Sequence, residues 1–220
     1  PQTLRHAAEW VEAHHQDDNW FLMVDSFDPH EPFDYPCEAE AYPDNYHDKL
    51  FFWPDYSTTD QAPQEAMEHV RRRYANLITM SDRWLGRLLD VLDRRGLWDD
   101  TMVILTTDHG YMLGEKGFYA KNYMPCYNEI YQIPLMISLP GMTQMTRCHA
   151  LSQNIDLMPT ILEYFGISES ECWHPLHGKS LLPLIRGERT ENHEAVLYGV
   201  FGRQVNICDG HYTYFRSALR

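Results

Sequence analysis

The sequence lacks long apolar runs and is poor in positive charge. No stretch approaches the roughly 18 apolar residues that a membrane-spanning helix needs, so we expect no segment of this chain to cross a bilayer. Lys and Arg number 18 against 32 Asp and Glu, which gives a formal net charge of -14. Because nucleic acid binds to basic faces, this balance argues against a nucleic-acid partner.

The sequence also lacks a cysteine pattern typical of metal sites or disulfide-bonded domains. The five cysteines are odd in number and none lies in a Cys-x-x-Cys spacing, which argues against both a zinc site and a disulfide framework. We therefore expect mostly free thiols, a state that favours a reducing compartment such as the cytoplasm. These residues are Cys37, Cys126, Cys148, Cys172 and Cys208.

The chain contains enough hydrophobic residues to form a folded core. It has 220 residues, of which 44% are hydrophobic and 13% aromatic, as in globular proteins. Residues 102–106 are apolar or β-branched and predict a strand buried on both faces, as in a parallel sheet. Asp108, His109 and Gly110 follow at its carboxyl end, where ligands of open α/β sheets gather. These residues are either two metal ligands or a polar turn.

A second apolar segment leads into a loop that carries a histidine. After a helix near the start of the chain, residues 20–24 predict a strand. Pro29 and Pro32 then fix the backbone on either side of His30, so the imidazole is held on a stiff loop. Such a loop is either a functional element or a surface turn.

The remaining segments predict a lid, two further helices and another strand. Residues 37–59 have no clear period and indicate a long loop over the site, whose aromatic residues either pack onto the domain or contact substrate. Thr59 or Asp60 is expected to cap a long helix that ends at Gly96. Residues 132–139 predict a strand, and Asp156 is expected to cap a helix over 157–165.

The end of the chain predicts antiparallel structure. Residues 195–200 indicate a strand, and 205–215 indicate a hairpin turned at Asp209 and Gly210. The Asp-Gly dipeptide suits a two-residue type I′ turn.

Taken together, these motifs resemble the sulfatase family of the alkaline phosphatase superfamily. The shared elements are a Pro-His-x-Pro loop, a strand followed by Asp-His-Gly, and a glycine-bearing loop that delivers Lys121 about a dozen residues later. The resemblance implies that Asp108 and His109 bind a divalent metal and that Lys121 contacts the anionic group of the substrate. It also implies that His30 lies against the scissile ester.

The resemblance also implies a fold class and a domain organisation. We expect an α/β fold with a mostly parallel sheet flanked by helices, and part of a small C-terminal antiparallel subdomain. The partial sulfatase-like domain would cover residues 1–190, and the antiparallel subdomain would begin within residues 191–220.

One part of the family pattern has no counterpart in this sequence. The family takes its nucleophile from a Cys/Ser-x-Pro-x-Arg segment, whose cysteine is oxidised to formylglycine, and none of the five cysteines has that context. We expect the nucleophile and the remaining metal ligands upstream of Pro1, which makes the chain the C-terminal portion of a longer enzyme. The family favours calcium as the metal, while the donor types also admit manganese, magnesium or zinc.

These implications lead to three functional hypotheses. The first is metal-dependent hydrolysis of sulfate esters by the complete protein, acting on a small anionic ester. The second is hydrolysis of phosphonate monoesters or phosphodiesters by the same residues. The third, from another class, is a non-catalytic binding module that keeps the fold. The sequence predicts no oligomeric state.

Overall fold

The computed structural model divides into two compact units. It describes residues 1–36, 40–43, 45–48, 51–60 and 62–217, so Cys37 and parts of the predicted lid lie outside the described residues. The first unit holds residues 1–125 and 132–142, and the second holds 126–131 and the chain from 143 onward. The domain boundary expected after residue 190 stays a prediction.

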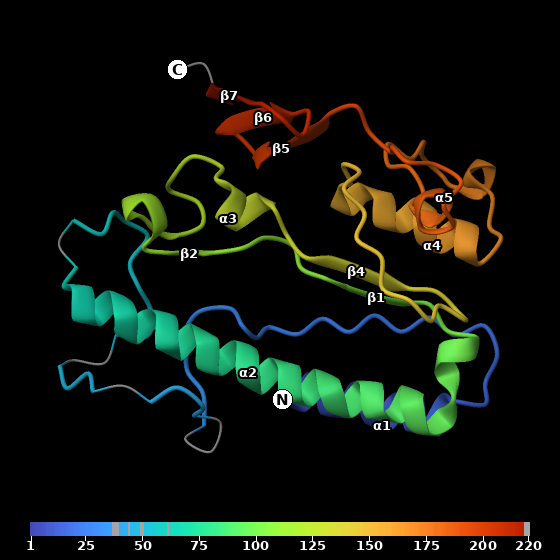
Figure 1. Cartoon of the computed structure of the whole chain (residues 1–220), viewed down its shortest axis with the longest axis horizontal. Coiled ribbons are helices and arrows are strands. Elements are labelled where there is room, and N and C mark those ends of the chain that lie inside the picture. Colours follow the sequence, from blue (N-terminus) through green and yellow to red (C-terminus); the bar gives the residue numbers. More distant parts are fainter. Residues whose placement is uncertain (37–39, 44, 49–50, 61, 218–220) are drawn as a thin grey trace. The chain divides into compact units, whose positions relative to one another are not determined.

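Two helices form the frame of the first unit. Helix α1 (Gln2–His14) packs along α2 (Gln64–Arg95), and Figure 1 shows α2 as the long helix of the molecule. Val11 of α1 joins Val91 and Leu92 of α2 in one buried cluster. Gly96 ends α2 as predicted, with a left-handed φ of 67°, and the short 3-10 helix η2 (Leu97–Asp99) follows.

Helix α2 begins later than the sequence predicted. Thr59 or Asp60 was expected to cap it, but the first helical residue is Gln64 and no side chain caps the helix. The backbone before it pairs with a distant loop instead. Thr59 N donates to Gly117 O and Tyr119 N donates to Ser57 O, both at 2.9 Å. These contacts hold the segment in an extended form.

The strand that precedes Asp108 pairs in an unexpected direction. Strand β1 (Val103–Thr106) lies antiparallel to β4 (Leu135–Ser138), with Leu105 opposite Met136. The predicted burial on both faces is wrong here, because the side chains of Leu105 and Met136 are 38% and 57% exposed. An apolar run reports a preference for burial, but it carries no information about the direction of the partner strand.

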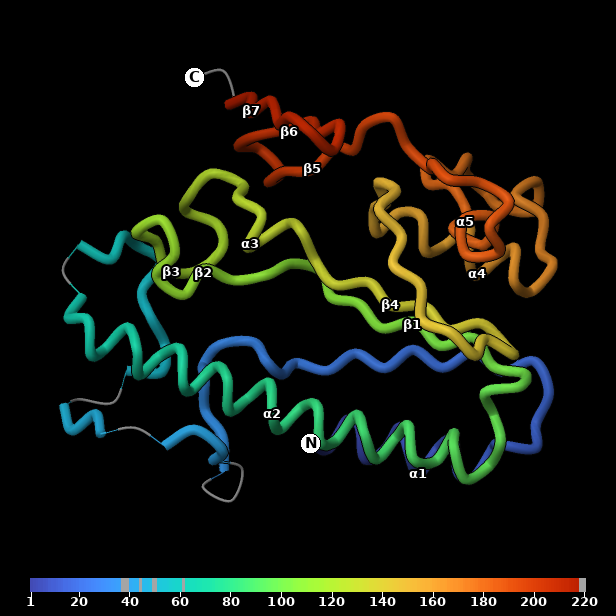
Figure 2. Tube along the Cα trace, in the orientation of Figure 1, coloured from blue at the N-terminus to red at the C-terminus, as the bar shows by residue number. Residues whose placement is uncertain are grey.

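The strand predicted over residues 20–24 is not formed as a paired strand. Figure 2 shows the segment after α1 as an extended trace, and its burial alternates, with Phe21 and Met23 exposed and Leu22 and Val24 partly buried. Leu22 packs against the cluster around Val11. Within the described residues no strand pairs with this segment. Its only strand-like feature is the alternation of exposed and partly buried side chains.

A small hairpin carries the loop that leads to Lys121. Its strands are β2 (Met112–Leu113) and β3 (Tyr119–Ala120), joined through the 3-10 turn η3 (Glu115–Gly117). Arg71 of α2 fixes the hairpin, because its Nε donates to Leu113 O at 3.0 Å. A second buried cluster, built on Phe33 and the α2 residues Val70 and Leu77, packs against Leu113.

The second unit contains short helices and one three-stranded sheet. Strands β5 to β7 form the antiparallel order β5-β6-β7, which confirms the predicted hairpin. Its turn is longer than the predicted type I′ turn: residues 209–212 form the loop, and Asp209 Oδ1 accepts from the backbone N–H groups of His211 and Tyr212. The elements are α3 (Asn128–Tyr131), η4 (Asn154–Asp156), α4 (Leu157–Tyr164), η5 (Glu169–Glu171), α5 (Leu182–Ile185), β5 (Val196–Val200), β6 (Gln204–Cys208) and β7 (Thr213–Ser217).

Asp156 has a different role from the predicted helix cap. It makes no side-chain cap to α4 and is fully buried. Its carboxylate accepts from His193 Nε2 at 2.9 Å and from the backbone N–H groups of Lys179 and Gln153 at 2.8 Å. Asp156 therefore ties three segments of the second unit together, which a local sequence pattern could not indicate.

Two expectations from composition can be compared with the described part of the chain. No described helix is long and apolar enough to span a membrane. The cysteines that the structure describes, Cys126, Cys148, Cys172 and Cys208, are free, as predicted.

Candidate functional site

His30 lies on the loop that follows the extended segment 20–24 and precedes the buried Phe33. Its Nδ1 is 2.6 Å from the carbonyl oxygen of Glu31, and its ring centroid is 4.5 Å from that of Phe27. A carbonyl only accepts hydrogen bonds, so Nδ1 must carry a proton. In the neutral imidazole the lone pair is then on Nε2, which is the atom left for chemistry.

Lys121 follows β3 and points at that atom. Its Nζ lies 2.5 Å from His30 Nε2, although the two residues are 91 positions apart in the chain. The preceding Ala120 is fully buried and has a φ of 78°, a conformation that a non-glycine residue rarely adopts. This backbone turn aims Lys121, which is only 8% exposed, into the unit. The structure thus brings the two predicted substrate-facing residues together.

Glu31 joins this pair, and sequence reasoning missed it. The residue is 3% exposed, and its carboxylate lies 3.4 Å from Lys121 Nζ. The hydroxyl of Tyr56, in the predicted lid, donates to the same carboxylate at 2.5 Å. Burial raises the pKa of Glu31, but the hydrogen bond from Tyr56, a backbone hydrogen bond and the charges of Lys121 and His30 outweigh it. The net result is a lowered pKa.

The lowered pKa of Glu31 predicts acid sensitivity. Because the folded state holds this carboxyl with a pKa below its ordinary value of 4.5, the folded protein binds fewer protons than the unfolded chain as the pH falls toward that value. The stabilisation is complete above that value and is lost as the pH falls through the folded pKa. We expect the complete wild-type protein to lose more thermal stability between pH 7 and pH 3.5 than Glu31→Gln does. Equal losses in the two proteins would contradict this prediction.

Two tyrosines interact with the carboxylate of Glu31. Burial raises the pKa of Tyr56, and its hydrogen bond to Glu31 raises it further. Burial likewise raises the pKa of Tyr111, with the charge of Glu31 as the next cause, and its hydroxyl has no hydrogen-bond partner among the described residues. Both phenols are therefore neutral proton donors near a carboxylate. The sequence placed Tyr56 among the aromatic residues of the lid but did not indicate its contact with Glu31, which lies 25 positions earlier.

Asp108 and His109 lie together beyond the end of β1. The backbone N–H of His109 donates to Asp108 Oδ1 at 2.8 Å, and His109 Nε2 is 3.6 Å from Asp108 Oδ2. Burial raises the pKa of Asp108, but the charge of His109 and hydrogen bonds from the backbone and Thr107 together lower it. The Asp108 side chain is nevertheless 82% exposed, so the two donors open toward solvent.

This pair has the donor chemistry that a divalent metal requires. His109 Nδ1 lies 2.9 Å from the carbonyl of Gly110 and donates to it, which leaves the Nε2 lone pair available for a metal. Carboxylate and imidazole together suit several divalent ions. Within the described ranges no group of three His, Cys, Asp or Glu side chains gathers for one ion. The role of the two residues as ligands stays a prediction, and it requires further ligands from outside the described residues.

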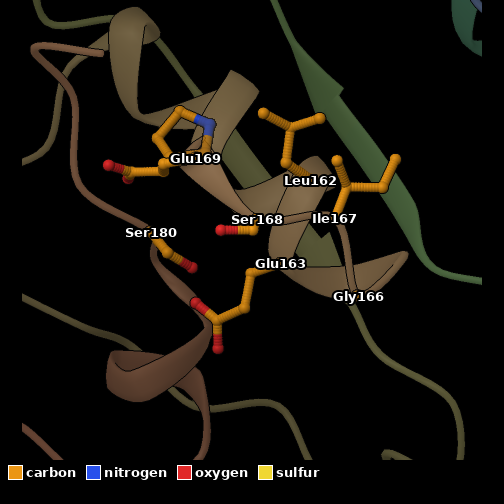
Figure 3. Close-up of a pocket in the computed structure, with 8 residues that line it drawn as sticks. Leu162, Glu163, Gly166, Ile167, Ser168, Glu169 and Ser180 are labelled. Carbon is orange, nitrogen blue, oxygen red and sulfur yellow. The ribbon is translucent and has the colours of Figure 1, made fainter. Parts of the chain in front are cut away.

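A separate hollow lies in the second unit. Figure 3 shows Ser168, Ser180 and Glu163 at this hollow, which has a volume of about 310 Å³. Glu163 is already paired with Arg186 at 3.2 Å. None of the four predicted site residues lines the hollow, so it adds nothing to the candidate site.

Comparisons with known proteins agree with the resemblance seen in the sequence. The Sulfatase family model matches residues 2–167. Choline-sulfatase of Rhizobium meliloti is 31% identical over 91% of this chain and 42% of its own length. The multifunctional alkaline phosphatase superfamily protein PehA of Trinickia caryophylli is 40% identical over 54% of this chain and 23% of its own length. The chain thus spans less than half the length of these relatives.

Structural similarity supports the same fold class. The crystal structure of a putative sulfatase from Bacteroides fragilis superposes with a TM-score of 0.78 at 22% identity, over 99% of this chain and 49% of that one. This likeness confirms the predicted α/β fold class, while the strand pairs described within this chain are antiparallel. The family model extends over most of the chain, from α1 to the residues just after α4. The chain belongs to the sulfatase family.

Proposed function

We propose that the complete protein hydrolyses sulfate esters and that this chain supplies four of the residues involved. His30 and Lys121 would face the substrate, and Asp108 and His109 would hold one divalent metal. The observation that carries this proposal is the 2.5 Å contact between Lys121 Nζ and His30 Nε2, made by residues of two separate loops. The match to choline-sulfatase over 91% of this chain supports it.

The rest of the machinery is proposed to lie outside these 220 residues. The chain matches only 42% of the length of choline-sulfatase, which supports its being one portion of a longer protein. We propose that the nucleophile, a formylglycine, belongs to the remaining portion. The 220-residue chain alone is accordingly expected to be inactive.

Lys121 is proposed to stabilise charge on the sulfuryl group. Negative charge builds up as the bond to the leaving oxygen breaks, and a fixed ammonium in a site that excludes water stabilises it strongly. Lys121 meets this requirement, because it is 8% exposed and is held by Glu31. Its charge and its orientation are present before the substrate arrives.

His30 is proposed to deliver a proton to the leaving group. Its Nδ1 proton is committed to the Glu31 carbonyl, so Nε2 is the atom that exchanges protons. In the absence of substrate, the Lys121 ammonium donates a hydrogen bond to this nitrogen. When the substrate is bound, a proton that Nε2 takes up from solvent would pass to the departing oxygen.

The proposed metal would be held by Asp108 Oδ2 and His109 Nε2 together with ligands from the rest of the protein. When bound, a divalent metal polarises the ester and lowers the pKa of an attacking hydroxyl. Calcium is proposed first, with manganese, magnesium and zinc as alternatives. The carbonyl of Gly110 orients His109 for this task.

A small anionic ester is the proposed substrate. The formal charge of -14 disfavours polyanions, whereas the local charges of Lys121 and a metal can hold one compact anion. Choline-sulfatase and N-acetylglucosamine-6-O-sulfatase, both relatives, are named for small sulfate esters.

A second candidate function is hydrolysis of phosphonate monoesters or phosphodiesters. One specific observation favours it: the multifunctional superfamily protein PehA has 40% identity to this chain over 126 residues. Sulfate and phosphonate monoesters are both tetrahedral anions, so the same Lys121 and His30 could serve either reaction.

The test is a comparison of kcat/KM on two esters. The complete, metal-loaded protein would be assayed with 4-nitrophenyl sulfate and with 4-nitrophenyl phenylphosphonate. We expect a preference for the sulfate ester of about 10²-fold or more, roughly 2.7 kcal/mol of differential transition-state binding. A phosphonate preference would establish the second candidate. Turnover of neither ester, together with no bound metal, would favour a non-catalytic binding module.

A further inference from the structure

The carboxylate of Glu31 lies close to both members of the His30 and Lys121 pair. Its oxygens lie 3.4 and 3.5 Å from Lys121 Nζ, and Oε2 lies 3.3 Å from His30 Nδ1. Tyr56 donates to Oε1 from the other side at 2.5 Å. Three groups from three separate segments therefore meet at one acidic side chain.

Burial makes this contact necessary for the charge of Lys121. The side chains of Glu31 and Lys121 are 2% and 9% exposed, so little water reaches either of them. An ammonium withdrawn from water is costly unless an opposite charge lies beside it. Glu31 supplies that charge and so allows a charged lysine to reside at this position.

The geometry also fixes where the ammonium points. Nζ carries three N–H donors. Within the described residues, one is directed to His30 Nε2 at 2.5 Å and one to the Glu31 carboxylate, which leaves the third for a substrate oxygen. Without the carboxylate, a flexible four-carbon stem would let Nζ leave this position.

We propose that Glu31 is a positioning residue, whose carboxylate holds the Lys121 ammonium beside Nε2 of His30 and aims its remaining donor at the ester. This inference rests on the proposed hydrolysis of an anionic ester. It assigns a role to a residue that would touch neither substrate nor metal. Misplacing a catalytic group by about 1 Å can cost about 10²-fold in rate, so the effect should be measurable.

A purely structural role for Glu31 makes a different prediction. In that case the carboxylate would serve only to tie Tyr56 of the lid to the loop around Pro32. Its loss would then lower stability and activity to the same extent whether or not Lys121 is present. The two roles therefore separate in a double-mutant cycle with Lys121.

The experiment measures kcat and KM of the complete protein on 4-nitrophenyl sulfate for four variants. These are Glu31→Gln, Lys121→Met, the double variant, and Glu68→Gln as a matched control, since Glu68 is an exposed glutamate paired with Arg72 on α2. We expect Glu31→Gln to lower kcat by about 10- to 100-fold in the wild-type background. In the Lys121→Met background the same change should alter kcat by less than about 3-fold, and Glu68→Gln should leave it unchanged.

Two kinetic results would overturn the proposal. One is a Glu31→Gln variant whose kcat stays within about 2-fold of wild type, and the other is an equal loss in both backgrounds. Thermal unfolding is followed in parallel. The double variant has no unpaired buried charge, so it should remain folded even where Glu31→Gln is weakened.

A spectroscopic measurement keeps this inference separate from the proposed function. With ¹⁵N-labelled histidine in the complete protein, the Nε2 resonance of His30 reports the hydrogen bond from Lys121. We expect Glu31→Gln to shift this resonance and Glu68→Gln to leave it in place. An unshifted resonance overturns the positioning role even in an active enzyme. If neither ester is hydrolysed, the proposed function fails, and a shift still shows that Glu31 holds the pair.

Discussion

Replacing Lys121 by alanine in the complete protein is expected to lower kcat for 4-nitrophenyl sulfate by about 10²- to 10³-fold. The ammonium is buried and lies 2.5 Å from His30 Nε2, and a water molecule in the space left by alanine would carry no positive charge to stabilise the sulfuryl oxygens. The expected loss is in kcat more than in KM, because the charge on those oxygens grows toward the transition state. Steady-state kinetics at saturating metal measures it.

The control for this prediction concerns stability. Lys121→Ala leaves Glu31 buried without its ammonium partner, a change that costs about 3–5 kcal/mol and could unfold the site. The double variant Glu31→Gln and Lys121→Met removes both charges and should recover thermal stability without recovering the rate. Lys116→Gln, a change of an exposed lysine on the same hairpin, should keep the wild-type kcat. Full activity of Lys121→Ala would remove Lys121 from the proposed mechanism.

The features that the sequence predicted well are those set by neighbouring residues. The apolar period of α1 and α2 and the glycine that ends α2 are local signals, and the structure confirms both. The motifs around His30, Asp108 and Lys121 are local signals as well, because each is complete within a few residues. Matching these motifs to a family placed His30 and Lys121 in one site although 91 positions separate them.

The features that were missed depend on contacts between distant segments. Glu31 reads as an ordinary charged residue of a turn, and only the folded chain shows that Lys121 and Tyr56 converge on it. In the same way, the apolar run of β1 was compatible with either strand direction, and the antiparallel pairing with β4 depends on where residues 135–138 return. The start of α2 was misplaced because Thr59 bonds to Gly117, 58 positions away.

Replacing Asp108 by asparagine is expected to weaken metal binding by the complete protein by about 10²-fold or more, and kcat with it. Asparagine keeps the shape of the side chain but removes the charge that a hard divalent cation requires. In this chain Asp108 Oδ2 and His109 Nε2 lie 3.6 Å apart and open toward solvent, so under the proposed function each would supply one donor to a metal whose other ligands lie elsewhere. Metal content after dialysis and the calcium dependence of thermal unfolding measure the change.

The two metal readouts need no turnover, so they test Asp108 even if the true ester is neither of the two assayed. A metal at about 100 times its Kd stabilises the folded wild-type protein by about 2.7 kcal/mol, and Asp108→Asn should lose most of this stabilisation. Asp90→Asn, a change of an exposed aspartate of α2, should keep the wild-type metal content and calcium response. If Asp108→Asn retains both, Asp108 is not a ligand, and its short contact with His109 is only the polar turn that the sequence also allowed. Suppose that manganese or zinc stabilises the wild-type protein but not Asp108→Asn, and that calcium stabilises neither. The assignment of Asp108 as a ligand then holds, and the choice of calcium is wrong.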